Sequence, residues 1–329
     1  MECWLRGGDG ESCTPDEGTT REVAIMNKSG QIKALIADDP TRRNRLIAEV
    51  VGCTRRLVRS VRQEMGPQVK NMPKILIFDI ETAPMEVYVW HLFKNVVMPG
   101  MVIKERSMLS WAAKWLFEDK IMGEHVTTKE ANDRTDKSIL SELWHLLNEA
   151  DIVVAHNGFS FDVKISNARF ALAGLNPPMP YRVIDTLSHS KRVFNFPSHK
   201  LDCLNGYFGL DMKMEHEGMT LWKKCVNWDG SALDTMLKYN KRDVTILEEF
   251  YLKIRPWMKG HPNVALYIDT EETLCTNCGN EDLTWGGYYF TPAGKYKSFR
   301  CDKCGAIGRS RISDLDKETR ARLLLSVAA

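Results

Sequence analysis

The chain contains one apolar run that ends in two acidic residues, Lys74-Ile75-Leu76-Ile77-Phe78-Asp79-Ile80-Glu81-Thr82. An apolar run of this length between Pro73 and Pro84 is typical of a buried strand. Residues two apart in a strand point to the same face, so Asp79 and Glu81 project to one side. Carboxylates are costly to bury without a partner, and a hard divalent cation such as Mg²⁺ or Mn²⁺ is the natural one. A strand end that runs into solvent is the alternative.

The composition of the 329-residue chain is that of a globular protein with one α/β domain and one or two small modules. No apolar stretch approaches the length of a membrane span, and no secretion signal opens the sequence, so we expect no membrane partner. Four of the nine cysteines form two tight pairs with metal-ligand spacing, and the other five are scattered. This usage suits a reducing compartment better than a disulfide scaffold, so a cytoplasmic location is expected.

The net charge of +2 is spread unevenly along the chain. Residues 41–70 carry eight Lys or Arg against two Glu, and residues 275–311 carry six against three acids. A central region with acidic catalytic candidates between two basic modules indicates a nucleic-acid partner, although a charge run can also be a solvated face.

The N-terminal region is predicted to be a disordered segment, residues 1–25, followed by a helix-turn-helix module, residues 26–70. Met26 directly precedes the first patterned segment, so translation could begin there. Asp38-Asp39-Pro40 is expected to end the first of three short helices, and Thr41 and Thr54 can cap the next two. Ala48, Gly52 four residues later and Val58 six residues after that resemble the pattern of the helix-turn-helix family.

The third predicted helix exposes four arginines, which would suit a helix in the major groove of DNA or along its phosphates: Arg55, Arg56, Arg59 and Arg62. A plain helical hairpin with a solvated basic face is the alternative to this DNA-binding interpretation.

The central domain, residues 73–258, is predicted to be a mixed α/β sheet flanked by helices. After the first strand, composition and periodicity favour strands at residues 87–90, 108–115, 120–127, 151–155 and 182–185. Helices are predicted at residues 136–150, 165–172, 201–208 and 231–254.

Two further motifs carry polar groups within this domain. One predicted strand leads into His156-Asn157-Gly158 and then Phe161-Asp162, at a strand-to-helix turn. The long C-terminal helix carries Tyr239 and Asp243, which share one face because they are four residues apart.

Taken together and in order, these motifs resemble those of the DEDD 3′–5′ exonuclease superfamily, which has the ribonuclease-H-like fold. Phe78-Asp79-Ile80-Glu81-Thr82 is similar to the first motif, residues 157–162 to the second and residues 239–243 to the third. The tyrosine at position 239 marks the tyrosine subclass. The Tyr-Asn-x-x-Asp form and Ser110-Trp111-Ala112-Ala113-Lys114-Trp115 resemble stand-alone enzymes of phage and bacterial genomes.

The resemblance implies that four carboxylates hold two Mg²⁺ or Mn²⁺ ions: Asp79, Glu81, Asp162 and Asp243. Such a pair stabilises both the attacking and the leaving oxygens in phosphoryl transfer. Tyr239 would orient the attacking water, because a pKa near 10 makes tyrosine a poor base at neutral pH. Asn157 would either position substrate or cap the turn, and Asp185, His156 and His199 are expected to be structural.

The C-terminal region, residues 270–312, has the spacing of a zinc ribbon. Cys275, Cys278, Cys301 and Cys304 form two Cys-x-x-Cys pairs, which predicts one structural Zn²⁺. The aromatic residues between the pairs alternate with lysine and arginine, which suits stacking on single-stranded bases, but they could equally pack the ribbon itself. Residues 313–329 are expected to form a short helix and a tail.

These features predict a metal-dependent 3′–5′ exonuclease that acts on nucleic acid. DNA is favoured as the substrate, and RNA stays open. Two alternatives stay open: a structure-specific endonuclease of the same fold and a non-catalytic DNA-binding regulator.

Overall fold

The computed structural model describes residues 27–38, 44–64, 72–93, 95–214 and 217–325. The chain divides into two compact units, residues 1–71 with 268–272 and residues 72–267 with 273–329. The predicted disordered segment, Met26 and the proposed cap Thr41 lie outside the described residues. No helix in the described part of the chain combines the length and the apolar character needed to cross a membrane.

The first unit contains three short helices, α2 (Lys28–Asp38), α3 (Asn44–Val51) and α4 (Arg55–Glu64). Each contributes to one small apolar core, made by Ile32, Ile36, Ile47, Ala48, Val51, Val58 and Val61. Gly52 has φ +62°, a left-handed conformation that favours glycine, and it turns the chain between α3 and α4. The Thr54 hydroxyl accepts a hydrogen bond from the Leu57 N–H at 3.3 Å, as the predicted cap requires.

The second unit is built on a five-stranded mixed sheet with the order β5-β4-β1-β6-β7. The strands are β1 (Ile75–Thr82), β4 (Met108–Trp115), β5 (Met122–His125), β6 (Ile152–Ala155) and β7 (Arg182–Asp185). Strand β1 pairs antiparallel with β4 and parallel with β6, and β7 extends the parallel side. The observed architecture therefore confirms the predicted mixed sheet.

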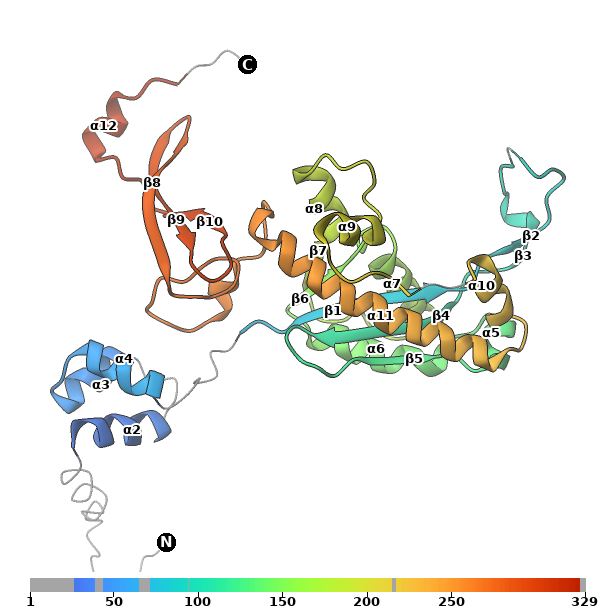
Figure 1. The fold of residues 1–329 in the computed structure, drawn as a ribbon, viewed down its shortest axis with the longest axis horizontal. Coiled ribbons are helices and arrows are strands. Elements are labelled where there is room, and N and C mark those ends of the chain that lie inside the picture. The colour runs from blue at the N-terminus through green and yellow to red at the C-terminus, as the bar shows by residue number, and fades with distance from the viewer. Residues whose placement is uncertain (1–26, 39–43, 65–71, 94, 215–216, 326–329) are drawn as a thin grey trace, which may run out of the picture. The chain divides into compact units, whose positions relative to one another are not determined.

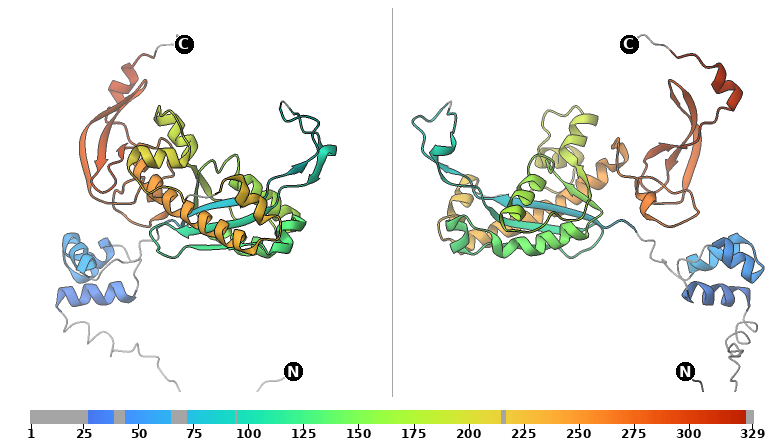
Figure 2. Two further views of the ribbon diagram at one scale, coloured as in Figure 1. Left: turned by 45° about the vertical axis from the view of Figure 1, so that its right-hand side comes forward. Right: turned by 180° about the vertical axis from the view of Figure 1, so that it is seen from behind.

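Helices cover both faces of this sheet, with α11 (Gly230–Ile254) on one face and α6 (Lys137–Glu149) on the other (Figures 1 and 2). The remaining helices are α5 (Thr128–Asp133), α7 (Asp162–Leu172), α8 (Thr186–Val193), α9 (Leu201–Phe208), α10 (Met219–Cys225) and the short η2 (Arg255–Trp257) and η3 (Val264–Tyr267).

The alternation along β1 decides where its acidic residues point. Leu76 and Phe78 pack in the core that contains α6 and the N-terminal half of α11, whereas Ile75 and Ile77 pack in the core that contains the C-terminal half of α11. Asp79 and Glu81 continue the second series, because successive side chains of a strand point to opposite faces. Both carboxylates therefore face α11.

Strand β4 fastens α11 to the sheet. Ser110, Ala112 and Lys114 pair with Glu81, Asp79 and Ile77 of β1, so they share the face that α11 covers. The Lys114 ammonium forms an ion pair with Glu248 of α11, and the other Glu248 oxygen accepts from the Phe117 N–H at 2.9 Å. On the opposite face the Trp111 indole donates to the Ile139 carbonyl at 2.8 Å.

One predicted strand is wrong. Only Glu86–Val87 forms a strand, β2, which pairs with β3 (Val102–Lys104) in a small separate sheet after the turn η1 (Pro99–Met101). Residues 88–90 have strand-forming side chains, but Tyr88 and Trp90 are exposed and the described backbone there is irregular. High strand propensity without a neighbouring strand does not make a strand.

The C-terminal region forms a three-stranded sheet of the order β10-β9-β8. Its strands are β8 (Leu283–Thr291), β9 (Gly294–Cys301) and β10 (Ile307–Arg309), and helix α12 (Lys317–Arg322) follows. The four cysteines lie at one end of this sheet and form a small core with Ala306.

Replacing the buried Lys114 should cost much more stability than replacing the surface residue Lys74. The side chains of the Lys114–Glu248 pair are 10% and 12% exposed, whereas those of the surface pair Lys74–Glu149 are 55% and 51% exposed. Lys114→Met should lower the free energy of unfolding by about 3–5 kcal/mol, because it leaves a buried carboxylate without its counter-ion. Lys74→Met should cost less than about 1 kcal/mol. Urea denaturation measures both, and similar small losses would contradict the clamping role of Lys114.

Candidate active site

Three acidic side chains from two elements converge above the sheet. Asp79 and Glu81 extend from β1 toward α11, and Asp243 of α11 points back toward them. One carboxylate oxygen of each lies within 4.8 Å of those of the other two. The first and third sequence motifs are thus brought together, although 162 positions separate Glu81 from Asp243.

Asp162 lies beside this group rather than within it. It is the first residue of α7, only 1% exposed, and its carboxylate accepts a hydrogen bond from the Ile80 N–H at 3.2 Å. Ile80 lies between Asp79 and Glu81, so this bond fixes the second motif against the first. The negative charge of Asp162 also raises the pKa of Asp79.

The negative charges of the acidic residues are only partly balanced by nearby positive charge. Burial, followed by the neighbouring charges of Asp162, Asp243 and Glu81, raises the pKa of Asp79 well above its usual value. Burial and the charge of Asp243 raise the pKa of Glu81 to about 8, and burial raises the pKa of Asp162 to about 7. Converging carboxylates in a low-dielectric setting disfavour one another's ionised forms. The donor set is made only of carboxylate oxygens, which fits a hard divalent cation such as Mg²⁺ or Mn²⁺.

A lysine that the sequence analysis did not select lies at this site. The Lys213 ammonium donates to the Asp243 carboxylate and, at 2.9 Å, to the Tyr239 hydroxyl. Although burial opposes it, the charge of Asp243 raises the pKa of Lys213, so the side chain is a cation. Burial and Asp243 raise the pKa of Tyr239, which therefore keeps its proton. Lys213 follows no motif spacing, and only the folded chain brings it to Asp243.

Asn240 is a second residue whose role emerges from the structure. It is fully buried on α11, and its amide donates to the Asp79 carboxylate at 2.6 Å. Its carbonyl oxygen accepts from the hydroxyl of Ser110, which is also fully buried, at 3.2 Å. The neutral amide restrains one Asp79 oxygen without adding charge. The Tyr-Asn-x-x-Asp sequence places Asn240 on the same helical turn as Tyr239 and Asp243. The orientation of its side-chain amide toward Asp79 depends on the hydrogen bond from Ser110 of β4.

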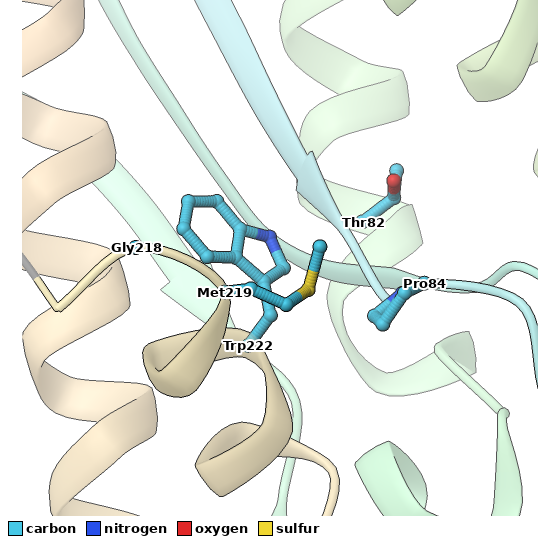
Figure 3. A pocket seen from close by; sticks show the side chains of 5 residues that line it. All are labelled: Thr82, Pro84, Gly218, Met219 and Trp222. Atoms are coloured by element: carbon cyan, nitrogen blue, oxygen red, sulfur yellow. The ribbon is translucent and has the colours of Figure 1, made fainter. Parts of the chain in front are cut away.

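An apolar pocket of about 350 Å³ lies at the end of β1 (Figure 3). Thr82 and Pro84 line one side, and Gly218, Met219 and Trp222 line the other. The Trp222 side chain also forms a hydrogen bond that lowers the pKa of Glu81 against the effect of burial. Trp222 therefore belongs both to the pocket and to the surroundings of the acidic cluster.

The turn of the second motif is held by Asp185. Asp185 caps α8 through the Leu187 and Ser188 N–H groups, and it also accepts from the N–H groups of Asn157 and Phe159, at 3.0 and 3.3 Å. Asn157 has φ +74°, a conformation that asparagine tolerates better than most residues. These contacts favour the turn-forming role of Asn157, and its contact with substrate stays a prediction.

The two histidines near the motifs are bonded within the fold. Burial lowers the pKa of His156 to about 4, and its ring bonds Thr186 and the His199 carbonyl at 2.9 and 3.0 Å. The His199 ring lies 2.7 Å from the Ser190 hydroxyl. Both histidine rings therefore make hydrogen bonds within the fold, as expected for structural residues.

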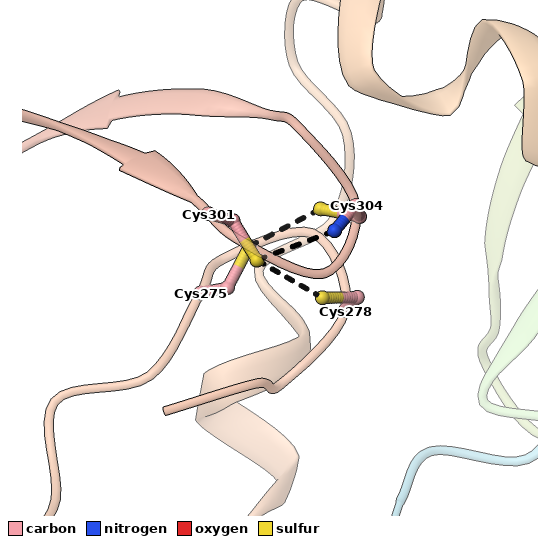
Figure 4. Close-up of side chains that lie close together, drawn as sticks. All are labelled: Cys275, Cys278, Cys301 and Cys304. Carbon is pink, nitrogen blue, oxygen red and sulfur yellow. Dashed lines mark hydrogen bonds between the residues drawn. The ribbon is translucent and has the colours of Figure 1, made fainter. Parts of the chain in front are cut away.

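The four cysteines predicted to bind zinc also come together (Figure 4). The Sγ atoms of Cys275 and Cys304 are 3.6 Å apart, as are those of Cys278 and Cys301. Zinc–sulfur bonds of about 2.3 Å in a tetrahedron place sulfurs at roughly this separation. Hydrogen bonds from the thiols of Cys278 and Cys304 lower the pKa of Cys275 to about 3, which favours the thiolate that binds metal. The residues fit one structural Zn²⁺.

The predicted DNA-contacting arginines lie on α4. Arg55, Arg56 and Arg59 are exposed, and Arg59 pairs with Glu272 at 2.8 Å. The side chain of Arg62 lies outside the described residues. DNA contact by these arginines stays a prediction.

The raised pKa values predict how the metal-free protein responds to pH. A carboxyl group whose pKa is raised on folding binds more protons in the folded state, so stability should fall as pH rises from 4.5 toward 8, the ordinary and folded values for Glu81. A divalent cation at 100 times its Kd should restore about 2.7 kcal/mol, roughly 5–10 °C in Tm. At a fixed cation concentration the gain should be larger at pH 8 than at pH 5, because protons compete with the cation for the carboxylates at pH 5.

Calorimetric scans in EDTA and in Mn²⁺ across this pH range measure the effect. Glu81→Gln provides the control, since it should stabilise the metal-free protein at pH 8 and not at pH 5. Stability that rises with pH in EDTA would contradict the electrostatic description of the cluster.

The Asn240 contact predicts weaker cation binding when it is lost. Asn240→Ala should raise the Kd for Mn²⁺ about 10- to 100-fold, because groups that orient metal ligands have effects of this size. Ser110→Ala should also raise the Kd for Mn²⁺. The two effects should not add in the double variant, because both substitutions break the same Ser110–Asn240–Asp79 series of hydrogen bonds. Ser190→Ala, another fully buried serine, should leave the Kd unchanged. Titration calorimetry on folded variants distinguishes this from a general loss of stability.

The cysteine cluster predicts one tightly held zinc per chain. Cys278→Ser should release that zinc and unfold the C-terminal sheet, because a module this small depends on its metal. Cys203→Ser, a half-buried thiol outside the cluster, should keep it. Elemental analysis of the purified proteins decides, and equal zinc contents in the two variants would contradict the assignment.

Comparison with known proteins agrees with this geometry. Residues 114–255 match the family model described as the RNase_H superfamily, a range that includes Asp162, Tyr239 and Asp243. The curated DNA polymerase III PolC-type of Ureaplasma parvum serovar 3 (strain ATCC 700970) is 27% identical over 203 residues. That alignment takes in 59% of this chain and 14% of the relative, so the chain spans a small part of the relative's length.

Among solved structures, the family B DNA polymerase from the hyperthermophilic archaeon Pyrobaculum calidifontis aligns with a TM-score of 0.42 and 15% identity, over 56% of this chain and 25% of that chain. The central domain is a ribonuclease-H-like domain, and its acidic motifs fit a DEDD exonuclease.

Proposed function

We propose that this protein is a metal-dependent 3′–5′ exonuclease that hydrolyses the phosphodiester bonds of DNA. The convergence of Asp79, Glu81 and Asp243, with Asp162 bonded to the backbone beside them, carries the proposal. These four carboxylates would hold two Mg²⁺ or Mn²⁺ ions, which when bound stabilise the charge that develops on the attacking and leaving oxygens.

The protein's own groups would position the reactants. Tyr239 keeps its proton and can hold the attacking water through its hydroxyl, with Asp243 one helical turn away. Lys213 balances the charge of Asp243 and would leave that oxygen when a cation takes it. Asn240 holds Asp79 in place.

The pocket beside Glu81 suggests an end-directed mode of cleavage. Met219, Trp222 and Pro84 offer apolar surface on which one base can rest, and aromatic side chains stack on any base. A terminal nucleotide held there would lie next to the acidic cluster. The exposed arginines of α4 favour DNA as the partner, because a basic helix suits the major groove.

Digestion of 5′-labelled DNA and RNA strands tests the proposal. With Mg²⁺ or Mn²⁺, wild-type protein should shorten DNA from the 3′ end, and EDTA should stop it. Asp79→Ala should abolish cleavage, and Tyr239→Phe should lower kcat about 100-fold, the range expected for a group that positions a proton-transfer partner. Asp234→Ala, an exposed acid on the same helix, should be as active as wild type.

Other product patterns would contradict the proposal in identifiable ways. Discrete internal fragments would assign the site to an endonuclease. Binding without cleavage of either strand would assign the protein to DNA-binding regulators.

A further inference from the structure

The zinc ribbon presents aromatic and basic side chains on one face. In the β8–β9 pairing, Tyr288 lies opposite Lys297, Phe290 opposite Lys295, and Trp285 opposite Phe299. Residues paired in this way share a face. A bulge between Trp285 and Tyr288, where Gly287 has φ +70°, keeps the three β8 aromatics on the same side. We call Trp285, Tyr288, Phe290, Lys295 and Lys297 the aromatic face.

The aromatic side chains of this face are exposed to solvent. Trp285 and Tyr288 are each 46% exposed and Phe290 is 67% exposed, whereas Phe299 is 5% exposed. The Phe299 ring lies over Gly308, where a Cβ would come within 2.4 Å of it. The sequence left open whether the aromatics pack the module. This explanation fits Phe299 and the inner side of Trp285, whose ring centroid lies 5.2 Å from that of Phe299, but not Tyr288 and Phe290.

The two lysines of this face lie on the strand that pairs with the exposed aromatic residues. The Lys295 ammonium is 3.8 Å from the centroid of the Tyr288 ring. The Lys297 side chain is 62% exposed, and its contact with Asp314, at 3.9 Å, is a weak surface pair. Exposed rings with adjacent cations match a ligand that is both planar and anionic.

The spacing suits successive bases of one extended strand. Residues two apart in a β-strand are separated by about 6.6 Å, so Tyr288 and Phe290 offer separate stacking surfaces. Stacking requires bases that are not already stacked in a duplex, and it tolerates any sequence.

We infer that the aromatic face binds single-stranded nucleic acid, with bases on Trp285, Tyr288 and Phe290 and phosphates on Lys295 and Lys297. The inference rests on the proposed function in one respect, that the substrate is a nucleic acid. In this inference the zinc ribbon binds the single strand, and the acidic site cleaves it.

The opposite face of the same strands provides a matched control. Tyr289 is 53% exposed and pairs with Tyr296, so the two rings share the opposite face, where the Arg309 guanidinium lies 5.5 Å from the Tyr289 ring centroid and 3.9 Å from that of Tyr296. Tyr289→Ala therefore removes an aromatic ring of similar exposure from the same strand and leaves the aromatic face intact.

Fluorescence anisotropy with a labelled 20-nucleotide DNA strand tests the inference. The full chain carries Asp79→Ala, so that binding is measured without cleavage, and zinc content confirms that each ribbon is folded. Tyr288→Ala and Phe290→Ala should each raise Kd about 5- to 100-fold, as loss of one stacked base does. Tyr289→Ala should change Kd less than about twofold. Lys297→Ala should reduce the slope of log Kd against log salt by about 0.7.

Two results would overturn the inference. One is equal binding by the Asp79→Ala parent and by its Tyr288→Ala and Phe290→Ala derivatives, which would leave the face to a protein partner. The other is duplex DNA that competes as well as single strands do. These outcomes are separate from the proposed function, because a chain that binds through this face but never cleaves DNA would fail only the exonuclease test.

Discussion

Repulsion between closely spaced carboxylates is the constraint on which the architecture of the acidic site depends. Asp79, Glu81 and Asp243 lie too close together to be ionised at neutral pH without a counter-charge. Lys213 supplies one positive charge at Asp243, and protonation or a bound cation can offset the rest of the repulsion. The surrounding contacts keep the acids in position: Lys114–Glu248 fixes α11 to β4, and Ser110–Asn240 links both elements to Asp79. Alternate residues from Ser110 to Lys114 therefore have different roles. Ser110, Ala112 and Lys114 face α11, whereas Trp111 and Ala113 pack in the core on the other face.

Much of this arrangement could be predicted from the sequence because its signals are local. Two-residue alternation placed Asp79 and Glu81 on one face, and four-residue spacing placed Tyr239 beside Asp243. The contributions of Lys213, Asn240 and Trp222 could not be predicted, since each depends on a contact between elements far apart in the chain. The strand expected at residues 87–90 failed for the same reason: its propensity was correct, but only Val87 has a pairing partner.

The two basic modules differ in what their structures add. The three helices of the first unit form the core that the helix-turn-helix pattern predicted, and three of the four arginines are exposed on α4. The ribbon adds information that the sequence lacked, because exposure separates the buried Phe299 from Trp285, Tyr288 and Phe290, whose rings are all at least 46% exposed. The fold thus combines an acidic site whose oxygens suit divalent cations with basic surfaces suited to phosphates.

Anomalous diffraction from crystals grown with Mn²⁺ would examine the acidic site most directly. We expect two peaks about 3.5–4 Å apart among Asp79, Glu81, Asp162 and Asp243, the separation of two-metal phosphoryl-transfer sites, with Lys213 displaced from Asp243. An acidic cluster without manganese, with Lys213 still bonded to Asp243 in saturating Mn²⁺, would contradict the cation-dependent site.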